Sequence, residues 1–406
     1  MDTTPPVFTL KRSSDTEILT TILNEASVNE FPFALWRLPN TTVKNLIISN
    51  QYQKLTEKPV IEELNTGFIF APFDKKKEKI FLPADYFFRF ENGQLKPPST
   101  PLEISSNTWL ENFKPAKDGI NYKIASYNKQ LSFQSVPLDY IELVRSGIAE
   151  IQNGSFEKVV PSRTKHVPLP DDFDIVKAFE KLCSAYPHAL VSFVNIPSVG
   201  TWLGATPEVL VSVEDKTIFR TVALAGTQRY KEGMNLKSIA WTQKDIEEQA
   251  LVELYIISCF KKIRLREYEE HGPKTSIAGN LIHLKSDFMV DMKATNFPQL
   301  GSIMLDLLHP TSAVCGMPLQ PATDFIKQRE GYDRSFYAGY LGPVNIDSNI
   351  NIFVNLRCMQ IFKTDAILYA GAGVTIDSIP ELELEETEMK FNTLLNVVFQ
   401  DAISSH

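Results

Sequence analysis

The sequence is poor in cysteine and has no spacing that would put its thiols to use. The four cysteines are far apart and lie in apolar surroundings, at Cys183, Cys259, Cys315 and Cys358. Neither a CxxC pair nor a Cys/His ligand spacing occurs, so a structural zinc site is not expected. We expect the thiols to be buried and free. A chain of 406 residues can form a large core, so its stability does not require disulfide bonds or structural metal ions.

Long apolar runs are missing as well. No stretch is apolar over the length that a membrane-spanning helix needs. The first residues, MDTTPPVFTLKRSSD, contain no apolar segment of signal-peptide length. We therefore expect a soluble, cytoplasmic protein with no membrane partner. The net charge of −8 argues against nucleic acid as a partner, although a local pocket of lysine, arginine or metal can still hold a small anion.

The common short signatures of catalysis are also missing. There is no Ser/His/Asp order, nucleophile elbow, phosphate-binding loop or HExxH motif. The glycine-rich stretch Tyr369-Ala-Gly-Ala-Gly-Val374 lacks the GxGxxG spacing, so a dinucleotide site is poorly supported there. A bare backbone that approaches a ligand carboxylate is the more economical interpretation of these glycines.

Helical and strand patterns alternate along the chain. Helices are expected at 137–152, 174–186, 235–264, 299–308, 322–330 and from Pro380 onward. Strands are expected at 31–37, 45–49, 66–72, 156–163, 276–284, 336–342, 350–362 and 367–373, with a β-meander at 189–224 and a surface loop at 93–125. This alternation indicates an α/β protein of the α+β type, with helices on the outer faces of antiparallel sheets.

The last of these helices carries an acidic face. Ser378 is expected to cap it and Pro380 fits its first turn. Glu383, Glu386 and Lys390 follow at i, i+3 and i+7, on one side of the helix. Two carboxylates and an ammonium on one face can hold a hard cation and an anionic ligand together. The ordinary alternative is a solvated acidic first turn that complements the helix dipole.

A second carboxylate pair, Asp245 and Glu248, has the same i, i+3 spacing on another predicted helix. One carboxylate from each helix would bind Mg²⁺ and the other two would act through water, whereas each pair separately fits a solvated face.

Two further side chains are candidates for general acid–base catalysis. Lys158 is either an edge lysine that keeps a strand from aggregating or a desolvated base of lowered pKa. Glu208 is either a turn residue that faces water or a partly buried general acid.

Several pieces, taken together and in order, resemble the chorismate-utilising enzymes and specifically the isochorismate synthases. The pieces are Lys158-Val-Val-Pro-Ser-Arg163, Leu203-Gly-Ala-Thr-Pro-Glu208, Leu224-Ala-Gly-Thr227, Lys244-Asp-Ile-Glu-Glu248, His309-Pro-Thr-Ser-Ala-Val-Cys-Gly316, Asn355-Leu-Arg357, Ala370-Gly-Ala-Gly373 and Pro380 through Lys390. The resemblance implies one large domain over 1–406 with the anthranilate-synthase large-subunit-like fold. In that fold two antiparallel sheets stack, helices cover their outer faces, and the site lies in a cleft. Residues 137–400 would form the chorismate-binding catalytic region, and 1–130 a variable N-terminal part.

The resemblance also implies a role for each matching residue. Mg²⁺ would be held by Glu248 and Glu386, with Asp245 and Glu383 acting through water. Substrate contacts would come from Gly226, Thr227, His283, Ala313, Tyr337, Arg357, Gly371, Gly373 and Lys390. Lys158 would be the base that activates water for attack at C2 of chorismate. Glu208 would be the acid that protonates the departing C4 hydroxyl.

Sister activities within the family stay open from the sequence. A salicylate synthase would share Lys158, but such enzymes tend to carry threonine where this chain has Ala313. Anthranilate synthases lack the lysine base, and aminodeoxychorismate synthases usually carry a lysine at the position of Ala225. A non-catalytic chorismate-binding scaffold is the other class. The resemblance further implies a monomer without a glutamine amidotransferase partner, and a product that serves menaquinone or siderophore biosynthesis.

Overall fold

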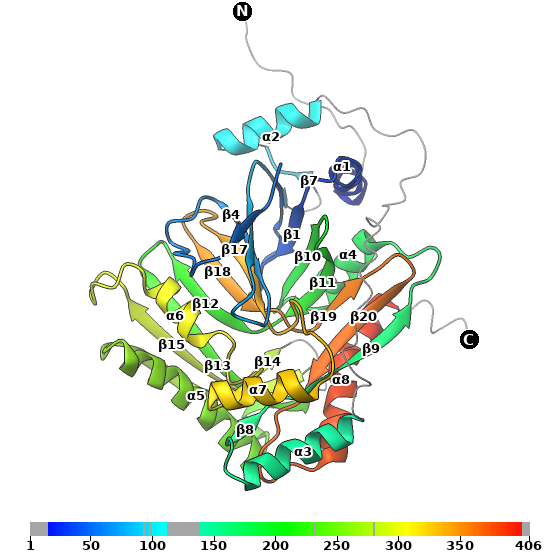
Figure 1. Cartoon of the computed structure of the whole chain (residues 1–406). Coiled ribbons are helices and arrows are strands. Elements are labelled where there is room, and N and C mark those ends of the chain that lie inside the picture. Colours follow the sequence, from blue (N-terminus) through cyan, green and yellow to red (C-terminus); the bar gives the residue numbers. More distant parts are fainter. Residues whose placement is uncertain are drawn as a thin grey trace, which may run out of the picture.

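A computed structural model describes residues 15–91, 94–97, 100–111, 139–230, 233–278 and 281–399 (Figure 1). Two antiparallel sheets of nine strands each form its central layers. The first sheet has the order β7 (Gln94–Leu95), β6 (Tyr86–Glu91), β2 (Lys44–Ile48), β1 (Phe33–Arg37), β10 (Leu190–Ile196), β11 (Gly200–Thr206), β19 (Cys358–Ile361), β20 (Asp365–Gly371) and β9 (Ser162–Pro168).

The second sheet combines early and late parts of the chain in the same way. Its order is β14 (Glu269–Ala278), β15 (Leu281–Asp291), β13 (Ile218–Arg229), β12 (Val209–Glu214), β18 (Ile350–Val354), β17 (Tyr340–Val344), β4 (Gly67–Ala71), β5 (Lys79–Pro83) and β3 (Gln53–Leu55). A small third sheet pairs β8 (Lys158–Val159) with β16 (Gly316–Met317).

The described chain also contains α1 (Asp15–Val28), α2 (Pro101–Glu111), α3 (Tyr140–Gln152), α4 (Ile175–Ala185), a 3₁₀ turn (Leu236–Ser238), α5 (Gln243–Lys262), α6 (Leu300–Leu308), α7 (Leu319–Arg329) and α8 (Pro380–Val398). Helices α1, α4 and α8 cover the first sheet, whereas α5 and α6 lie against the second (Figure 1). No helix of the described chain is long and apolar enough to cross a membrane.

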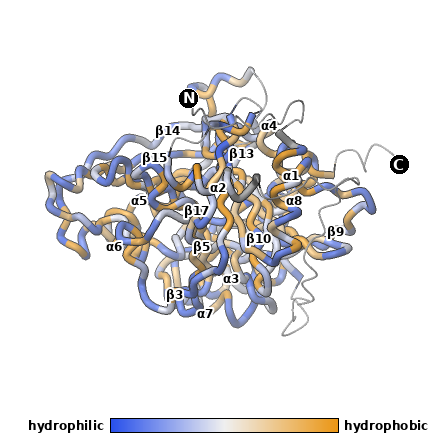
Figure 2. Tube along the Cα trace, turned by 90° about the horizontal axis from the view of Figure 1, so that it is seen from above, coloured by the Kyte–Doolittle hydropathy of each residue, from blue (hydrophilic) through white to orange (hydrophobic). Residues whose placement is uncertain are grey.

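Side-chain alternation along the strands creates two apolar layers. On β1, Phe33 and Leu35 join the layer beneath the outer helices, while Ala34 and Trp36 face the second sheet. Trp36 packs against Phe68 of β4, with 5.3 Å between ring centroids, which joins the two sheets. Figure 2 shows hydrophobic residues concentrated along the central strands and hydrophilic ones along the outer loops. The predicted architecture of stacked antiparallel sheets with outer helices is confirmed.

Several predicted boundaries are wrong. The expected meander at 189–224 is two hairpins in different sheets, since β10 and β11 belong to the first sheet and β12 and β13 to the second. The expected strand at 156–163 is divided between β8 and β9. The expected strand at 276–284 is divided between the paired ends of β14 and β15, and its residues 279–280 lie outside the described residues. Apolar runs of this kind look alike whether a strand continues or changes sheet.

Three further predictions also need correction. The loop expected at 93–125 contains α2, while 112–138 lie outside the described residues. The helix expected at 235–264 begins at Gln243, where Thr242 and Asp245 form a reciprocal capping box. The residue at the N-terminal cap of α8 is Ile379, and the hydroxyl of Ser378 instead accepts the Thr375 N–H at 3.0 Å.

Candidate active site

A cavity with about 620 Å³ of space, open solvent at its mouth included, lies where the two sheets meet α5 and α8. Most of the predicted site residues line it: Glu208, Gly226, Thr227, Glu248, His283, Ala313, Tyr337, Arg357, Gly371, Gly373, Glu386 and Lys390. Lys158, Asp245 and Glu383 are not among the lining residues. The structure therefore gathers residues that are up to 182 positions apart in the sequence, between Glu208 and Lys390, into one pocket.

Apart from Ala313, the apolar part of the lining was not predicted from the sequence. It consists of Val160, Pro207, Leu224, Ala225, Val314 and Leu356. Each of these residues is within two positions of a candidate site residue, which is the one signal that would have found them. Together they supply the hydrophobic wall that a ring-shaped ligand needs, while the polar groups fix its orientation.

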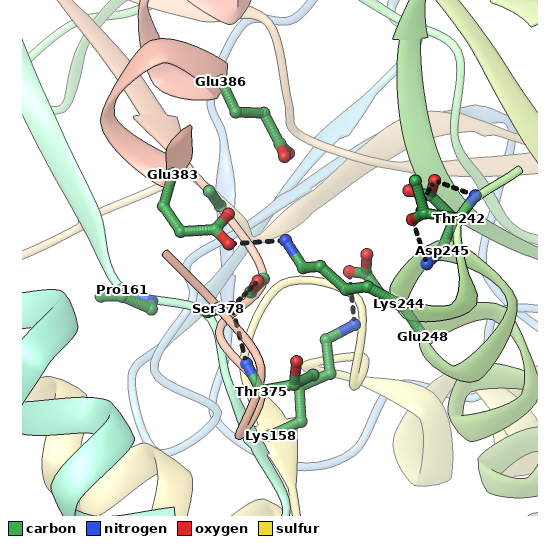
Figure 3. Close-up of polar contacts among 12 residues, drawn as sticks. Lys158, Pro161, Thr242, Lys244, Asp245, Glu248, Thr375, Ser378, Glu383 and Glu386 are labelled. Atoms are coloured by element: carbon green, nitrogen blue, oxygen red, sulfur yellow. Dashed lines mark hydrogen bonds and ion pairs between the residues drawn. The ribbon is translucent and has the colours of Figure 1, made fainter. Parts of the chain in front are cut away.

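Helices α5 and α8 present their first turns to the same region, with Lys244 between them (Figure 3). Glu248 comes from α5 and Glu386 from α8, and both reach the cavity. Glu383 is buried and pairs with Lys244, at 2.5 Å between Oε1 and Nζ. Asp245 is held in the capping box by Thr242, at 2.7 Å from the hydroxyl to Oδ2.

Lys158 lies behind Glu248 rather than on the cavity surface. Its side chain is fully buried, and its Nζ is 2.8 Å from Glu248 Oε1. Burial alone would raise the pKa of Glu248, but the charges of Lys158 and Lys244 outweigh it and lower that pKa to about 2. Lys158 and Glu248 therefore form a buried ion pair.

Gly373 makes this arrangement possible. A Cβ at that position would lie 2.3 Å from Glu248 Oε1 and 3.2 Å from Lys158 Cε. Any other residue would displace the carboxylate or the lysine beneath it. The backbone of this glycine-rich stretch therefore makes room for the charged groups of the site, which agrees with a close backbone approach and not with a dinucleotide loop.

The donor set suits Mg²⁺. Glu248 and Glu386 offer carboxylate oxygens from two helices to one cavity, and Mg²⁺ is commonly bound by one or two carboxylates plus water and substrate oxygens. No group of three or more His, Cys, Asp or Glu side chains in the described ranges forms a metal site by itself. A metal there would need ligands from water or from a bound anion.

Glu208 has the environment of a carboxylic acid. It lies where the chain passes from β11 to β12, and therefore from one sheet to the other. Burial raises its pKa to about 7, although the charges of Arg357, Lys158 and Lys390 act in the opposite direction. A carboxyl group with that pKa is partly protonated at neutral pH and can donate a proton.

His283 is a neutral ring with one nitrogen free for a ligand. Its Nδ1 is 2.7 Å from the Gly226 carbonyl oxygen and therefore donates to it. Burial and the charge of Arg357 lower its pKa to about 3. The buried Nε2 has no hydrogen-bond partner within the described chain. This lone pair on the cavity wall is suited to accept a hydrogen bond from a ligand hydroxyl.

The other cations of the cavity are Arg357 and Lys390. Burial lowers the pKa of Arg357, which adopts a left-handed backbone conformation with φ of 46°. Lys390 Nζ lies 2.6 Å from Glu386 Oε1 and donates to the Gly371 carbonyl at 2.7 Å. Positive groups thus line a cavity in a chain whose net charge is negative, as an anionic ligand requires.

Comparisons with known proteins identify the family and the fold. A family model described as "Chorismate binding enzyme" matches residues 41–399. Isochorismate synthase DhbC of Bacillus subtilis (strain 168) is 29% identical over 279 residues, which cover 66% of this chain and 69% of that protein. Two solved structures have the same fold. The menaquinone-specific isochorismate synthase MenF of Escherichia coli superposes with a TM-score of 0.71 at 20% identity, over 93% of this chain and 91% of that one.

Anthranilate synthase component I of Streptococcus pneumoniae superposes with a TM-score of 0.66 at 19% identity, over 89% of this chain and 92% of that one. It confirms the expected fold. The family model extends from β2 into the end of α8 and includes every residue that lines the cavity. The chain therefore belongs to the family of chorismate-binding enzymes.

Proposed function

We propose that this protein is an isochorismate synthase that converts chorismate to isochorismate and requires Mg²⁺. The main observation in support is that one cavity is lined both by Glu208, a buried carboxyl group of raised pKa, and by the carboxylates of Glu248 and Glu386. The similarity to Isochorismate synthase DhbC over two-thirds of the chain supports the same activity.

The proposed reaction includes two proton transfers, one during attack at C2 of the ring and one during departure of the hydroxyl from C4. Lys158 takes a proton from water while the water oxygen forms a bond to C2 of the ring. The ring double bonds shift, the C4–oxygen bond breaks, and Glu208 protonates the departing hydroxyl so that it leaves as water. Only a neutral amine has the lone pair that accepts this proton, so the Lys158 ammonium has to separate from Glu248 and give up a proton before the step.

The other residues hold the substrate in place. Arg357 and Lys390 would neutralise its carboxylates, and His283 Nε2 would accept a hydrogen bond from a ring hydroxyl. Glu248 and Glu386 would hold the metal, which when bound would neutralise the ring carboxylate. The apolar lining excludes bulk water, so a positioned water molecule is the nucleophile.

Product analysis tests the proposal directly. Purified protein is incubated with chorismate and Mg²⁺, with and without EDTA, and the products are separated by chromatography. We expect isochorismate in the presence of Mg²⁺ and none with EDTA. If the products were salicylate and pyruvate, the protein would be a salicylate synthase instead. If chorismate bound without turnover, the protein would be a non-catalytic scaffold.

A further inference from the structure

A second depression of the described chain is lined by four lysines. It lies between the loop after β3, the turn that joins β4 to β5, and α6, and it has about 850 Å³ of space, open solvent included. The lining residues are Thr56, Glu57, Lys58, Lys75, Lys76, Lys79 and Asp306. The active-site cavity shares none of these residues, so the depression is a separate feature of the surface.

Positive charge exceeds negative charge in this depression. Its lining contributes four ammonium groups but only two carboxylates, those of Glu57 and Asp306. The Asp306 carboxylate is already shared, because its oxygens lie 2.6 Å from Lys58 Nζ and 2.8 Å from Lys75 Nζ. A bound anion would balance the excess, even though the whole chain has a net charge of −8.

Two other acids of the β4–β5 turn have counter-ions of their own. Asp74 pairs with Lys327 at 2.7 Å, and Glu78 pairs with Lys54 at 2.9 Å. Neither acid lines the depression. The turn therefore carries acids beside its lysines without pairing them with the lysines of the lining.

Lys79 is the least satisfied of the four lysines. The residue is only 8% exposed, and no carboxylate of the described residues forms an ion pair with it. Its ammonium donates to the Lys75 carbonyl oxygen at 3.1 Å, although an ammonium has three protons to donate. Burial lowers the pKa of Lys79, and the attraction of the shared Asp306 does not offset it. A buried cation without a counter-charge is unfavourable, so a bound anion would stabilise it.

The residue types of the lining favour a phosphate group over a carboxylate. Lysine binds phosphate as a point charge, whereas planar pairing with a carboxylate is typical of arginine, which does not occur in the lining. We propose that this depression binds the phosphate group of a small anion through Lys76 and Lys79. The group is either free phosphate or part of a phosphorylated metabolite. This inference does not depend on the proposed function.

Calorimetry on the full-length protein tests the site. Sodium phosphate is titrated at pH 8, in EDTA and at constant ionic strength, into the wild type, Lys76→Gln, Lys79→Met and Lys77→Gln. We expect saturable binding by the wild type. Lys76→Gln and Lys79→Met should each weaken it by about tenfold or more, because each removes a charge-assisted hydrogen bond to the anion.

Lys77→Gln is the matched control. Lys77 lies on the same turn and loses the same charge on substitution, but it pairs with Asp333 and does not line the depression. Its variant should keep the phosphate affinity of the wild type. An equal loss in Lys77→Gln would mean that the overall surface charge attracts phosphate, and the proposal of a site would then be wrong.

A further variant separates this site from the active-site cavity, which also contains cations. Lys390→Gln removes an ammonium from that cavity and should leave phosphate affinity unchanged. If phosphate binding is weakened by Lys390→Gln but not by Lys76→Gln, the anion binds in the active site and the proposal is overturned. A wild type without saturable binding overturns it as well. Thermal melting without phosphate establishes that each variant is folded, and Lys76→Gln decides the matter if Lys79→Met does not fold.

Two further ligands define the chemical class. Ribose 5-phosphate is titrated in the same way, and tighter binding than that of inorganic phosphate would identify a phosphorylated metabolite as the ligand. Equal or weaker binding would identify free phosphate. Malonate, a dicarboxylate, should bind about tenfold more weakly than phosphate or worse, because the lining offers no planar pair of donors. Equal affinity for malonate would overturn the assignment to phosphate.

Discussion

Glu208 shows how a residue acquires its chemistry from its position in the fold. Thr206 ends β11 and Val209 starts β12, so the two residues between them cross from one sheet to the other. The crossing buries the Glu208 carboxyl group between the sheets, and burial is the cause of its raised pKa. A turn within one meander, as the sequence pattern indicates, would have left the same residue in water.

This placement predicts a pH dependence. A general acid has to be protonated, and with a pKa of about 7 Glu208 is protonated below pH 7 and ionised above it. The value of kcat/KM should therefore be highest on the acid side of this pKa and fall about tenfold per pH unit well above it. Glu208→Gln should lower kcat by about 10²–10⁴-fold and remove that limb of the profile.

The measurement is kcat/KM for chorismate from pH 6 to 9, in the wild type and in Glu208→Gln. Glu388→Gln is the control, because Glu388 lies outside the cavity and its variant should keep the wild-type limb. A limb that persists in Glu208→Gln would assign the titration to another group and remove Glu208 from the acid role.

The candidate residues of the site were easier to predict from the sequence than the contacts that these residues make. Lys158 and Glu208 were candidates because titratable groups beside apolar strands are unusual, and the two carboxylate pairs because of their i, i+3 spacing on predicted helices. Their contacts depend on long-range geometry that local spacing does not contain. Asp245 illustrates the limit, since its spacing from Glu248 indicated a metal site while its side chain is bonded to Thr242 in a helix cap.

At the scale of elements, a buried ion pair joins several walls of the cavity. Glu330, at the end of α7, accepts from the Ser162 N–H at 2.8 Å and bonds the Arg334 guanidinium. Arg334 donates to the carbonyls of Val160 at 2.7 Å and Val314 at 2.8 Å, and both of those valines line the cavity. The pair thereby fixes the start of β9 and the segment before β16 relative to each other.

Removing one partner of this pair should be costly. Glu330→Gln leaves the Arg334 charge buried without a counter-charge, so the free energy of unfolding should fall by about 3–5 kcal/mol. Glu381→Gln is a matched control, because Glu381 pairs with Arg145 on the surface, at 3.3 Å and with both side chains more than half exposed. It should cost less than about 1 kcal/mol. Urea unfolding of both variants measures the difference, and equal small losses would show that the buried pair adds little stability.

Elements were predicted best where one periodic pattern filled one element. Helices α3, α4, α6 and α7 begin within three residues of their predicted starts, because each buries a regular apolar stripe. Strand ends were predicted poorly. The division of 156–163 into β8 and β9 follows from pairing with β16 on one side and β20 on the other, and those partners are more than 150 positions away.

At the scale of the whole molecule, the N-terminal third is built into both sheets. Strand β1 lies between β2 and β10, and β4 lies between β5 and β17. The aromatic side chains of Trp36, Phe68 and Phe70 are fully buried in the layer between the sheets. The division into a variable part at 1–130 and a catalytic region at 137–400 therefore does not correspond to separate sheets.

A fragment of residues 139–399 should consequently not fold, although it contains every residue that lines the cavity. It would expose the edges of β10 and β17 as unpaired strands, which promotes aggregation. Each large apolar side chain that loses its burial costs about 1.5–3 kcal/mol. The fragment keeps Phe193, Trp202 and Phe336 but lacks Phe33 and Phe70, whose rings pack against them, and exposing several such side chains costs an amount comparable to a typical net stability of about 5–15 kcal/mol. Circular dichroism and thermal melting should show no cooperative transition for the fragment, and a sharp one for the full chain. A fragment that melts cooperatively and binds chorismate would show instead that the catalytic region is an independent folding unit.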